Sequence, residues 1–411
     1  MKLLNFFNLI ILIFITIFFI FTSSFGDINY FLELTYRIED QELNFKDYIC
    51  FLNNFTIYPL IFLGDILGYY TLAYYLLACS VGILISFLMI RLYENIFEIK
   101  RSINRYYFLF YFILPFGIAG YYVDIILYLF ASISVFFYFK QGSLNFYLSA
   151  IFLAFCVFIK YFSATPFVLA FGFIFFIEWY YANFKLKYLI KPLKFFIFFS
   201  FVTTFMLSIY IYLNDINIEL MYEYLFKEML DSGSSRLTNL FDSIFFLNYN
   251  IFKAIINFNV GIILFYLFII CFYFSIYLLI KIILTKKDEK QALLLIFIIV
   301  SSSFTFLLAG RDWNHKILFL PILLIMTIDY LNFKYLNNYK ITNVLKAKYL
   351  LIPFILIYSL VPLNERLKLK QNKFNSFTSE NFNNYFIKID KGRFKNLFYS
   401  LRSNYLIDNG F

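Results

Sequence analysis

Segments of about 20 consecutive apolar residues recur along the whole chain, and a helix of that length spans the hydrocarbon core of a bilayer. Apolar residues make up 62% of the 411 residues and charged residues only 15%, against roughly 25% in soluble domains. A water-soluble fold cannot bury that much apolar surface, so the composition excludes a soluble enzyme, a disordered chain and a disulfide scaffold. The chain is predicted to be an all-α, polytopic integral membrane protein.

About eleven transmembrane helices are predicted, within one domain over residues 1–363 that precedes a basic tail over 364–411. Short loops rich in Lys and Arg face the cytoplasm, which puts the N-terminus inside. The outer loops 26–65, 214–257 and 310–316 then hold fewer Lys and Arg than carboxylates. We expect a protein of the cytoplasmic (inner) membrane whose site faces the exterior or periplasm. The predicted spans are 4–24, 66–90, 106–118, 124–139, 144–159, 164–181, 195–213, 258–284, 291–308, 317–331 and 349–363.

The sequence contains no recognisable metal or nucleotide motif. Cys79, Cys156 and Cys271 lie inside apolar runs and His315 is the only histidine, so neither a zinc site nor a disulfide framework is predicted. No phosphate loop or dinucleotide fingerprint occurs, and no nucleic-acid partner is expected. No cofactor is predicted with certainty, and participation of a divalent cation is left open.

The segment that follows the first span is rich in carboxylates. Apolar side chains recur there at helical spacing, while Asn29, Glu33 and Arg37 line the opposite face. This pattern predicts an amphipathic helix on the outer surface of the membrane. Asp27 precedes the helix, where a carboxylate serves as an N-cap or as a general base that faces a lipid-linked substrate. Glu33 belongs to a solvated face or contacts the substrate.

Three further candidates lie where predicted spans reach the outer side. Pro59 is expected to break the segment before the second span, and Asp65 caps that span or supplies a second acidic group. Asp124, in a glycine-rich turn, caps the fourth span or lines the site. Lys160 lies between two apolar spans, where it snorkels to the surface or binds a lipid phosphate.

The outer loop 214–257 is predicted to begin with a second surface helix. Asp215 is expected to be its N-cap, because an Asp ahead of a helix accepts a backbone N–H. We interpret the loop as a lid or as an acceptor-binding segment.

The outer loop 310–316 joins two long apolar segments and gathers three potential cations. Arg311 pairs with Asp312, or its fork of donors binds a phosphate or pyrophosphate at the level of the lipid headgroups. His315 and Lys316 follow closely, so we name them with Arg311 as candidate substrate-binding residues. Trp313 is expected to be an interfacial belt residue.

The order of these motifs resembles that of the GT-C superfamily, integral membrane glycosyltransferases that use polyprenyl-phosphate sugars. The resemblance covers about residues 1–331 and rests on short motifs. In chain order these are the loop that begins with Asp27, Tyr58-Pro59-Leu60, the turn 120–124, the stretch 160–166 and the Leu-Pro-Ile-Leu sequence at 320–323. In that family the acidic residue of the first outer loop is the proposed base, which corresponds to Asp27. Ile28 stands where the family often has a second acidic residue, which argues against a metal-binding pair.

The resemblance implies transfer of a hexosyl or pentosyl group from a polyprenyl-phosphate donor to a glycan, lipid or protein acceptor, as in the synthesis of cell-envelope polysaccharides. Asp27 would act as the base, Arg311 with Lys160 or His315 would stabilise the leaving phosphate, and inversion is expected. A weaker resemblance to EpsG-like and O-antigen-polymerase-like proteins is carried by Gly26-Asp27 with Tyr30 and by Ser163-Ala164, and it leaves a polysaccharide polymerase as an alternative. A transporter of lipid-linked glycans is a third reading.

Overall fold

The computed structural model describes residues 56–68, 70–98, 122–160, 163–222, 260–286 and 288–308, together with isolated positions near residues 34–38 and 322–327. Within these ranges the protein is entirely helical and contains no strand, which confirms the all-α prediction for this part of the chain. The predicted spans 4–24, 106–118 and 349–363, most of 317–331 and the tail 364–411 lie outside the described residues.

The chain enters the bundle through a short helix and a sharp turn. Helix α3 (Tyr58–Leu67) has Pro59 in its first turn, where the missing N–H costs nothing, so Pro59 starts a helix rather than breaking one. Gly68 ends α3 in the left-handed conformation at φ 74°, and its N–H donates to the carbonyl of Gly64 at 2.7 Å. Helix α4 (Tyr70–Phe97) follows, so the predicted span 66–90 starts too early and ends too early.

Helices α6 (Tyr122–Lys140) and α7 (Ser143–Ile159) form an antiparallel hairpin, in good agreement with the predicted spans 124–139 and 144–159. Gly142 makes the turn at φ 96°, a conformation that glycine adopts without strain. Inside the hairpin the buried Ser134 hydroxyl donates to the carbonyl of Ser149 at 2.7 Å. Buried alanines allow the two helices to approach closely.

Helix α8 (Thr165–Tyr181) and helix α9 (Ile190–Asn214) are joined by a turn and the 3₁₀ helix η2 (Leu186–Leu189). Helices therefore occur where the spans 164–181 and 195–213 were predicted, although α9 begins earlier. Asp215 ends α9 in the left-handed conformation, and its N–H donates to the carbonyl of Ile211. The predicted role of Asp215 as an N-cap is therefore wrong, because the next helix, α10 (Ile218–Tyr222), begins after Asn217.

Helices α13 (Val260–Thr285) and α14 (Glu289–Leu308) match the predicted spans 258–284 and 291–308. Asp288 lies directly before α14 and its Oδ1 accepts the backbone N–H of Gln291 at 3.2 Å, as an N-cap carboxylate does. Thr35 and Ile38 are helical too, with Thr35 buried and Ile38 packed against the core. Both belong to the predicted amphipathic helix after the first span, on the face opposite Asn29, Glu33 and Arg37.

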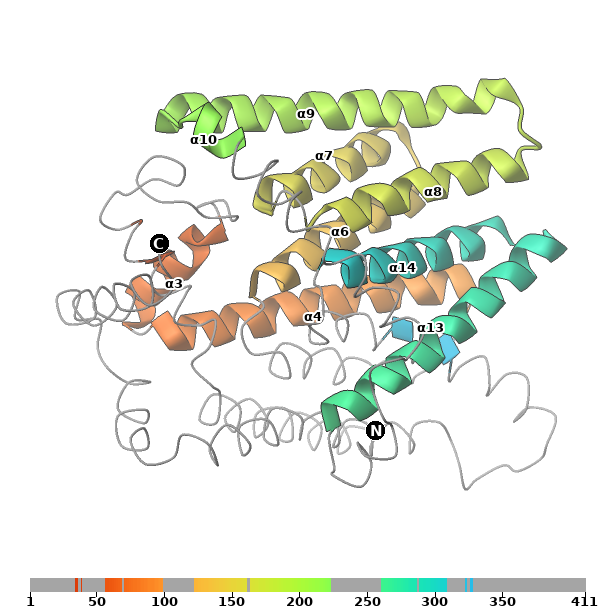
Figure 1. Cartoon of the computed structure of the whole chain (residues 1–411), viewed down its shortest axis with the longest axis horizontal. Coiled ribbons are helices and arrows are strands. Elements are labelled where there is room, and N and C mark those ends of the chain that lie inside the picture. The colour runs from red at the N-terminus through yellow and green to blue at the C-terminus, as the bar shows by residue number, and fades with distance from the viewer. Residues whose placement is uncertain are drawn as a thin grey trace.

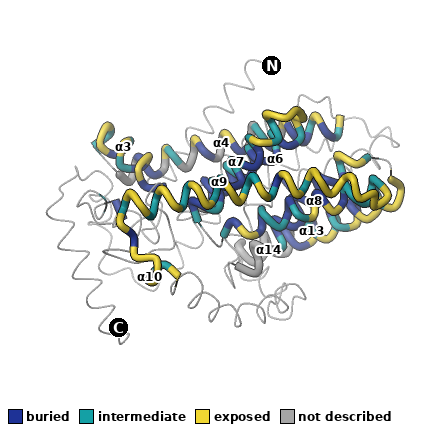
Figure 2. Tube along the Cα trace, turned by 90° about the horizontal axis from the view of Figure 1, so that it is seen from above, coloured by how far each residue is buried: buried dark blue, intermediate teal, exposed yellow. Residues whose placement is uncertain are grey.

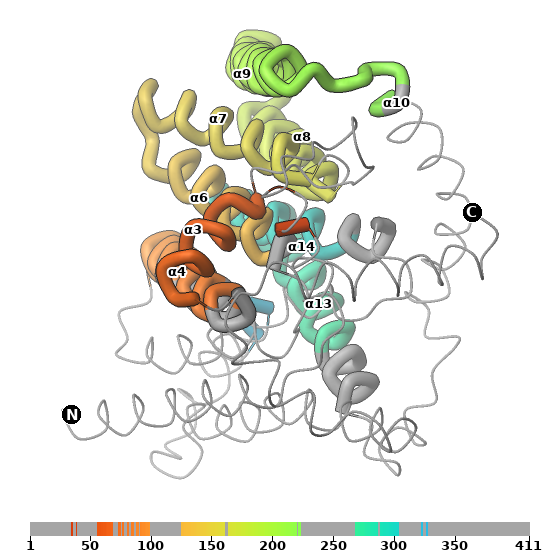
Figure 3. The backbone as a smooth tube through the Cα atoms, turned by 90° about the vertical axis from the view of Figure 1, so that its left-hand side faces the viewer, coloured from red at the N-terminus to blue at the C-terminus, as the bar shows by residue number. Residues whose placement is uncertain are grey.

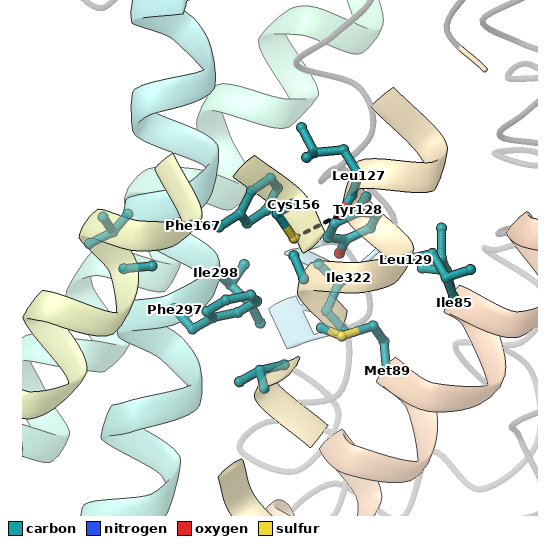
Figure 4. Packing of buried hydrophobic residues seen from close by; sticks show 14 of the residues in the cluster. Ile85, Met89, Leu127, Tyr128, Leu129, Cys156, Phe167, Phe297, Ile298 and Ile322 are labelled. Carbon is teal, nitrogen blue, oxygen red and sulfur yellow. Dashed lines mark hydrogen bonds between the residues drawn. The ribbon is translucent and has the colours of Figure 1, made fainter. Parts of the chain in front are cut away.

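The described helices run side by side in two rows (Figures 1 and 3). One row consists of α4, α6, α7 and α9 in that order, and the other consists of α13, α14 and α8. The rows meet at two places: α14 contacts α4, and α8 contacts α7. Between them lies a core of aromatic and aliphatic side chains, which includes Cys156, Tyr128, Phe167 and Phe297 (Figure 4).

Helix α9 packs against α7 and exposes its other side along its whole length, as the yellow stretches of Figure 2 show. Two helical stretches, Leu186–Asn214 and Phe268–Thr285, are long and apolar enough to cross a membrane by length and composition. Four shorter apolar helices accompany them. These two stretches suggest that the protein is associated with a membrane.

Candidate functional site

The residues on which the sequence-based mechanism depends most are outside the described part of the chain. Asp27 and Glu33 of the first outer loop belong to this group, as do Arg311, His315 and Lys316 of the loop 310–316. Three other predicted site residues, Asp65, Asp124 and Lys160, belong to described helices or their ends.

Asp65 and Asp124 do not have the capping positions that were expected. Asp65 is exposed and belongs to the last turn of α3, five residues before α4 begins, so it cannot cap α4. Asp124 is the third residue of α6 rather than the residue ahead of it. Both N-cap predictions are wrong, and the alternative interpretation of each as a group at the outer site stays a prediction.

Lys160 terminates α7 in an extended conformation and is half-buried. Its backbone N–H donates to the carbonyl of Cys156 at 3.2 Å, and its carbonyl accepts the N–H of Ala164 at 3.2 Å. These two hydrogen bonds fix the backbone of Lys160 in the connection between α7 and α8.

The structure brings the helix ends that carry these three residues to one end of the bundle. Helix α3, the start of α6 and the end of α7 all lie at the left in Figure 1. The turns from α8 to α9 and from α13 to α14 lie at the opposite end. The loops that were predicted to be outer and those predicted to be inner therefore lie at opposite ends of the bundle of described helices.

A polar cluster at the second end joins three helices. Glu178 of α8 accepts a hydrogen bond from the Tyr138 hydroxyl of α6 at 2.6 Å. Lys191 of α9 donates to both carboxylate oxygens of Glu178, at 2.7 and 2.8 Å, and to the Tyr138 hydroxyl at 2.9 Å. Both carboxylate oxygens of Glu178 thus accept hydrogen bonds. A carboxylate bonded in this way is better suited to holding helices together than to acting as a general base.

Aromatic packing orients Tyr138 toward that cluster. The rings of Phe171, Phe175 and Phe195 surround Tyr138 edge-on, with centroid separations of 5.6, 5.6 and 6.4 Å. The Lys191 ammonium lies 4.7 Å from the centroid of the Tyr138 ring, within the range of a cation–π contact. The hydroxyl of Tyr138 therefore reaches Glu178 while its ring stays in the core.

Glu289, at the start of α14, interacts electrostatically with the same cluster. Its partial burial and the negative charge of Glu178 raise the pKa of Glu289, and the positive charges of Lys191 and Lys290 offset part of that increase. The protonation of Glu289, in the first turn of α14, therefore depends on the charge of Glu178 in α8.

Two turns meet beside this cluster. The Lys286 ammonium, after α13, donates to the Asn183 side-chain oxygen at 3.2 Å and lies 4.9 Å from the centroid of the Tyr180 ring. The Tyr181 hydroxyl donates to the carbonyl of Ile282 at 3.3 Å. These contacts join the turn after α8 to the turn after α13.

Glu178 is the residue that sequence analysis missed. The available signal was a carboxylate inside the apolar segment 164–181, since an ionisable group there requires a partner. The identity of its partners depends on the register of three helices.

Comparison of the chain with protein-family models, with curated proteins and with solved structures found no match. Among the described residues, no three His, Cys, Asp or Glu side chains gather closely enough to hold a metal ion.

Proposed function

We propose that the protein is a polytopic membrane glycosyltransferase of the GT-C type, with about eleven transmembrane helices. It transfers a sugar from a polyprenyl-phosphate donor to an acceptor at the outer face of the cytoplasmic membrane. Asp27 is the general base. Arg311, assisted by Lys160 or His315, binds the phosphate of the donor.

This proposal is supported mainly by one observation: the helix ends that carry candidate site residues and the helix ends that carry lysine-rich turns lie at opposite ends of the bundle. One end of the bundle is formed by α3, the start of α6 and the end of α7, which carry Asp65, Asp124 and Lys160. The opposite end carries the lysine-rich turns, which the positive-inside rule assigns to the cytoplasm. This polarity supports a substrate site at the outer end, where the first outer loop and the loop 310–316 are predicted.

The proposed reaction is a direct displacement at the anomeric carbon. The acceptor oxygen forms a bond to that carbon while the bond from the carbon to the phosphate oxygen of the donor breaks. The hydroxyl proton passes to the carboxylate of Asp27, and the electron pair of the broken bond leaves with polyprenyl phosphate. Arg311 and its cationic neighbours stabilise the negative charge on that phosphate. A displacement of this kind inverts the configuration of the sugar.

The test is sugar transfer by the purified, lipid-reconstituted protein with a panel of polyprenyl-phosphate sugars. Asp27→Asn should lower product formation by roughly 100-fold or more, the scale of a general base. Arg311→Ala should also lower it. Glu42→Gln, which removes a different carboxylate from the same predicted outer loop, is the matched control and should keep the parent rate.

Each outcome distinguishes the alternatives. Transfer that is unaffected by Asp27→Asn would remove Asp27 from the mechanism. Failure with every monophosphate donor, followed by turnover of pyrophosphate-linked oligosaccharides, would instead identify a polymerase. Movement of lipid-linked glycans across the bilayer without formation of a new bond would identify a transporter.

A further inference from the structure

The lysine end of the bundle consists of two neighbouring connections with their flanking helix ends: residues 183–194, from the end of α8 into α9, and residues 281–290, from the last turn of α13 into α14. They are held together by the hydrogen bond of 3.2 Å between Lys286 and Asn183. Lysines crowd both turns: Lys185, Lys187, Lys191, Lys194, Lys281, Lys286 and Lys290.

Two of these lysines interact with neighbouring side chains of the protein, and two others form no ion pair in the described part of the chain. Lys191 is neutralised by Glu178, and Lys286 bonds to Asn183 beside the Tyr180 ring. Lys185 and Lys194 are exposed and form no ion pair within the described part of the chain. The first turn therefore presents uncompensated positive charge to its surroundings.

Large apolar side chains alternate with these lysines and are exposed as well. Leu186 is 77% exposed and Leu193 61%, and their apolar neighbours are exposed to a lesser extent, between 39% and 54%. The others are Phe184, Tyr188, Leu189 and Ile190. A soluble surface avoids such a patch, whereas a segment in the membrane interface combines lysines with apolar and aromatic residues.

The length of the adjoining candidate span places these lysines at the level of the headgroups. The stretch Leu186–Asn214 has 29 residues, and about 20 are enough to cross the hydrocarbon core. The surplus of about nine residues corresponds to the lysine-bearing start, because ammonium groups leave hydrocarbon for the interface. Lys187, Lys191 and Lys194 all fall within that start.

We propose that the lysine end binds anionic phospholipids of the bilayer. The ammonium groups of Lys185, Lys187 and Lys194 pair with lipid phosphates, while Leu186 and Leu193 insert among the upper parts of the acyl chains. Lys191 positions the turn through Glu178 rather than binding lipid. The continuity of this turn with a long, exposed apolar helix favours a bilayer over a soluble acidic partner. This inference requires only a membrane location and not the transfer reaction.

The protein contains its own reporter for this site. Trp179 is in the last turn of α8, and its ring centroid lies 4.9 Å from that of Phe184 in the lysine-rich turn. The only other tryptophan is Trp313, so Trp313→Phe leaves Trp179 as the single tryptophan. Its fluorescence is measured in vesicles in which brominated phosphatidylglycerol or brominated phosphatidylcholine, both quenchers, replaces part of the unlabelled lipid.

Brominated phosphatidylglycerol should quench Trp179 with an apparent affinity roughly five-fold or more above that of brominated phosphatidylcholine, because one lysine near an anionic surface contributes on that scale. The triple variant Lys185→Gln, Lys187→Gln, Lys194→Gln should lose the preference, as should 1 M salt. The control triple Lys46→Gln, Lys227→Gln, Lys253→Gln removes the same charge from predicted outer loops and should keep the preference.

Equal quenching by the two lipids would overturn the proposal, and so would an equal loss of preference in both triple variants. Inorganic phosphate at matched ionic strength should compete no better than chloride. If phosphate alone abolishes the preference, the site binds a small anion rather than a bilayer lipid, which also contradicts the proposal.

Discussion

Lys191 of α9 forms an ion pair of 2.7 Å with Glu178 of α8, across the turn that connects the two helices. The Lys191 side chain is 45% exposed and that of Glu178 is 18% exposed, so the pair is at the edge of the packed core. Tyr138 of α6 completes the contact from a third helix. One carboxylate therefore links three helices that are otherwise held by apolar packing.

The pair should stabilise the fold by about 1 kcal/mol, the upper part of the range for a partly exposed ion pair. A double-mutant cycle with Glu178→Gln and Lys191→Met, measured by denaturation in neutral detergent, isolates this coupling. Lys185→Met is the matched control, since Lys185 forms no ion pair within the described residues, and it should leave the free energy of unfolding nearly unchanged. Additive effects of the two cluster substitutions would contradict the prediction.

Tyr138→Phe should lower the free energy of unfolding by about 1–2 kcal/mol, because a buried hydroxyl that donates to a carboxylate is lost while the ring remains. Tyr147→Phe is the comparison: Tyr147 lies on the neighbouring helix α7, is 40% exposed, and its ring packs on Phe198. That substitution should have little effect. Equal destabilisation by the two substitutions would show that the hydroxyl of Tyr138 is not what matters.

Glu289→Gln should become more stabilising, relative to the parent, as the pH rises. Burial and the charge of Glu178 raise the pKa of Glu289 in the folded protein, so the folded state binds more protons than the unfolded state between 4.5, the ordinary value, and the raised value. The contribution of Glu289 to the free energy of unfolding therefore falls as the pH rises through that window. The difference in free energy of unfolding between variant and parent is measured across the acidic range. A difference that is constant with pH would contradict the assignment, and Glu178→Gln should bring the pKa of Glu289 closer to 4.5.

Helix positions were predicted well where an apolar run ends at charged or small residues. The predicted span 144–159 differs by one residue from α7, and the predicted span 164–181 differs by one residue from α8. The helix α3 was missed because Pro59 was taken as a break, although proline is well accommodated in a first helical turn. Composition alone predicts where hydrocarbon-length helices lie but not how they are connected.

Neither the residues that cap the helices nor the pairing of polar side chains between helices could be predicted from the sequence. Capping was one interpretation of Asp65 and Asp124 and the only one of Asp215. Asp215 instead adopts the left-handed conformation at a helix end, which aspartate tolerates better than most residues. The pairing of Glu178 with Tyr138 spans 40 residues and depends on the rotation of α6 relative to α8. Periodicity does not determine that rotation, so the polar cluster could not be predicted.

Ala150→Leu should lower the free energy of unfolding by about 1–3 kcal/mol, because added methylenes in a tightly packed core force its neighbours apart. Ala150 is fully buried and adjoins Ser149, whose carbonyl accepts the Ser134 hydroxyl of α6. Ser200→Leu adds a side chain of the same kind at an exposed position of α9. It should be nearly neutral in detergent, and a loss there comparable to that of Ala150→Leu would argue against the described packing.

Phe201→Lys should impair membrane integration of α9. Phe201 is 64% exposed near the middle of the candidate span Leu186–Asn214, so in a bilayer the new ammonium would face hydrocarbon. A lysine at the centre of a spanning helix costs about 2.5–3.5 kcal/mol on insertion scales, whereas at a water-exposed position the same change costs almost nothing. The fraction of chains that span the membrane is measured with topology reporters fused after residue 214, and Phe201→Leu is the control that keeps an apolar side chain. Integration of Phe201→Lys at the level of the control would mean that this face of α9 meets water or another protein rather than lipid.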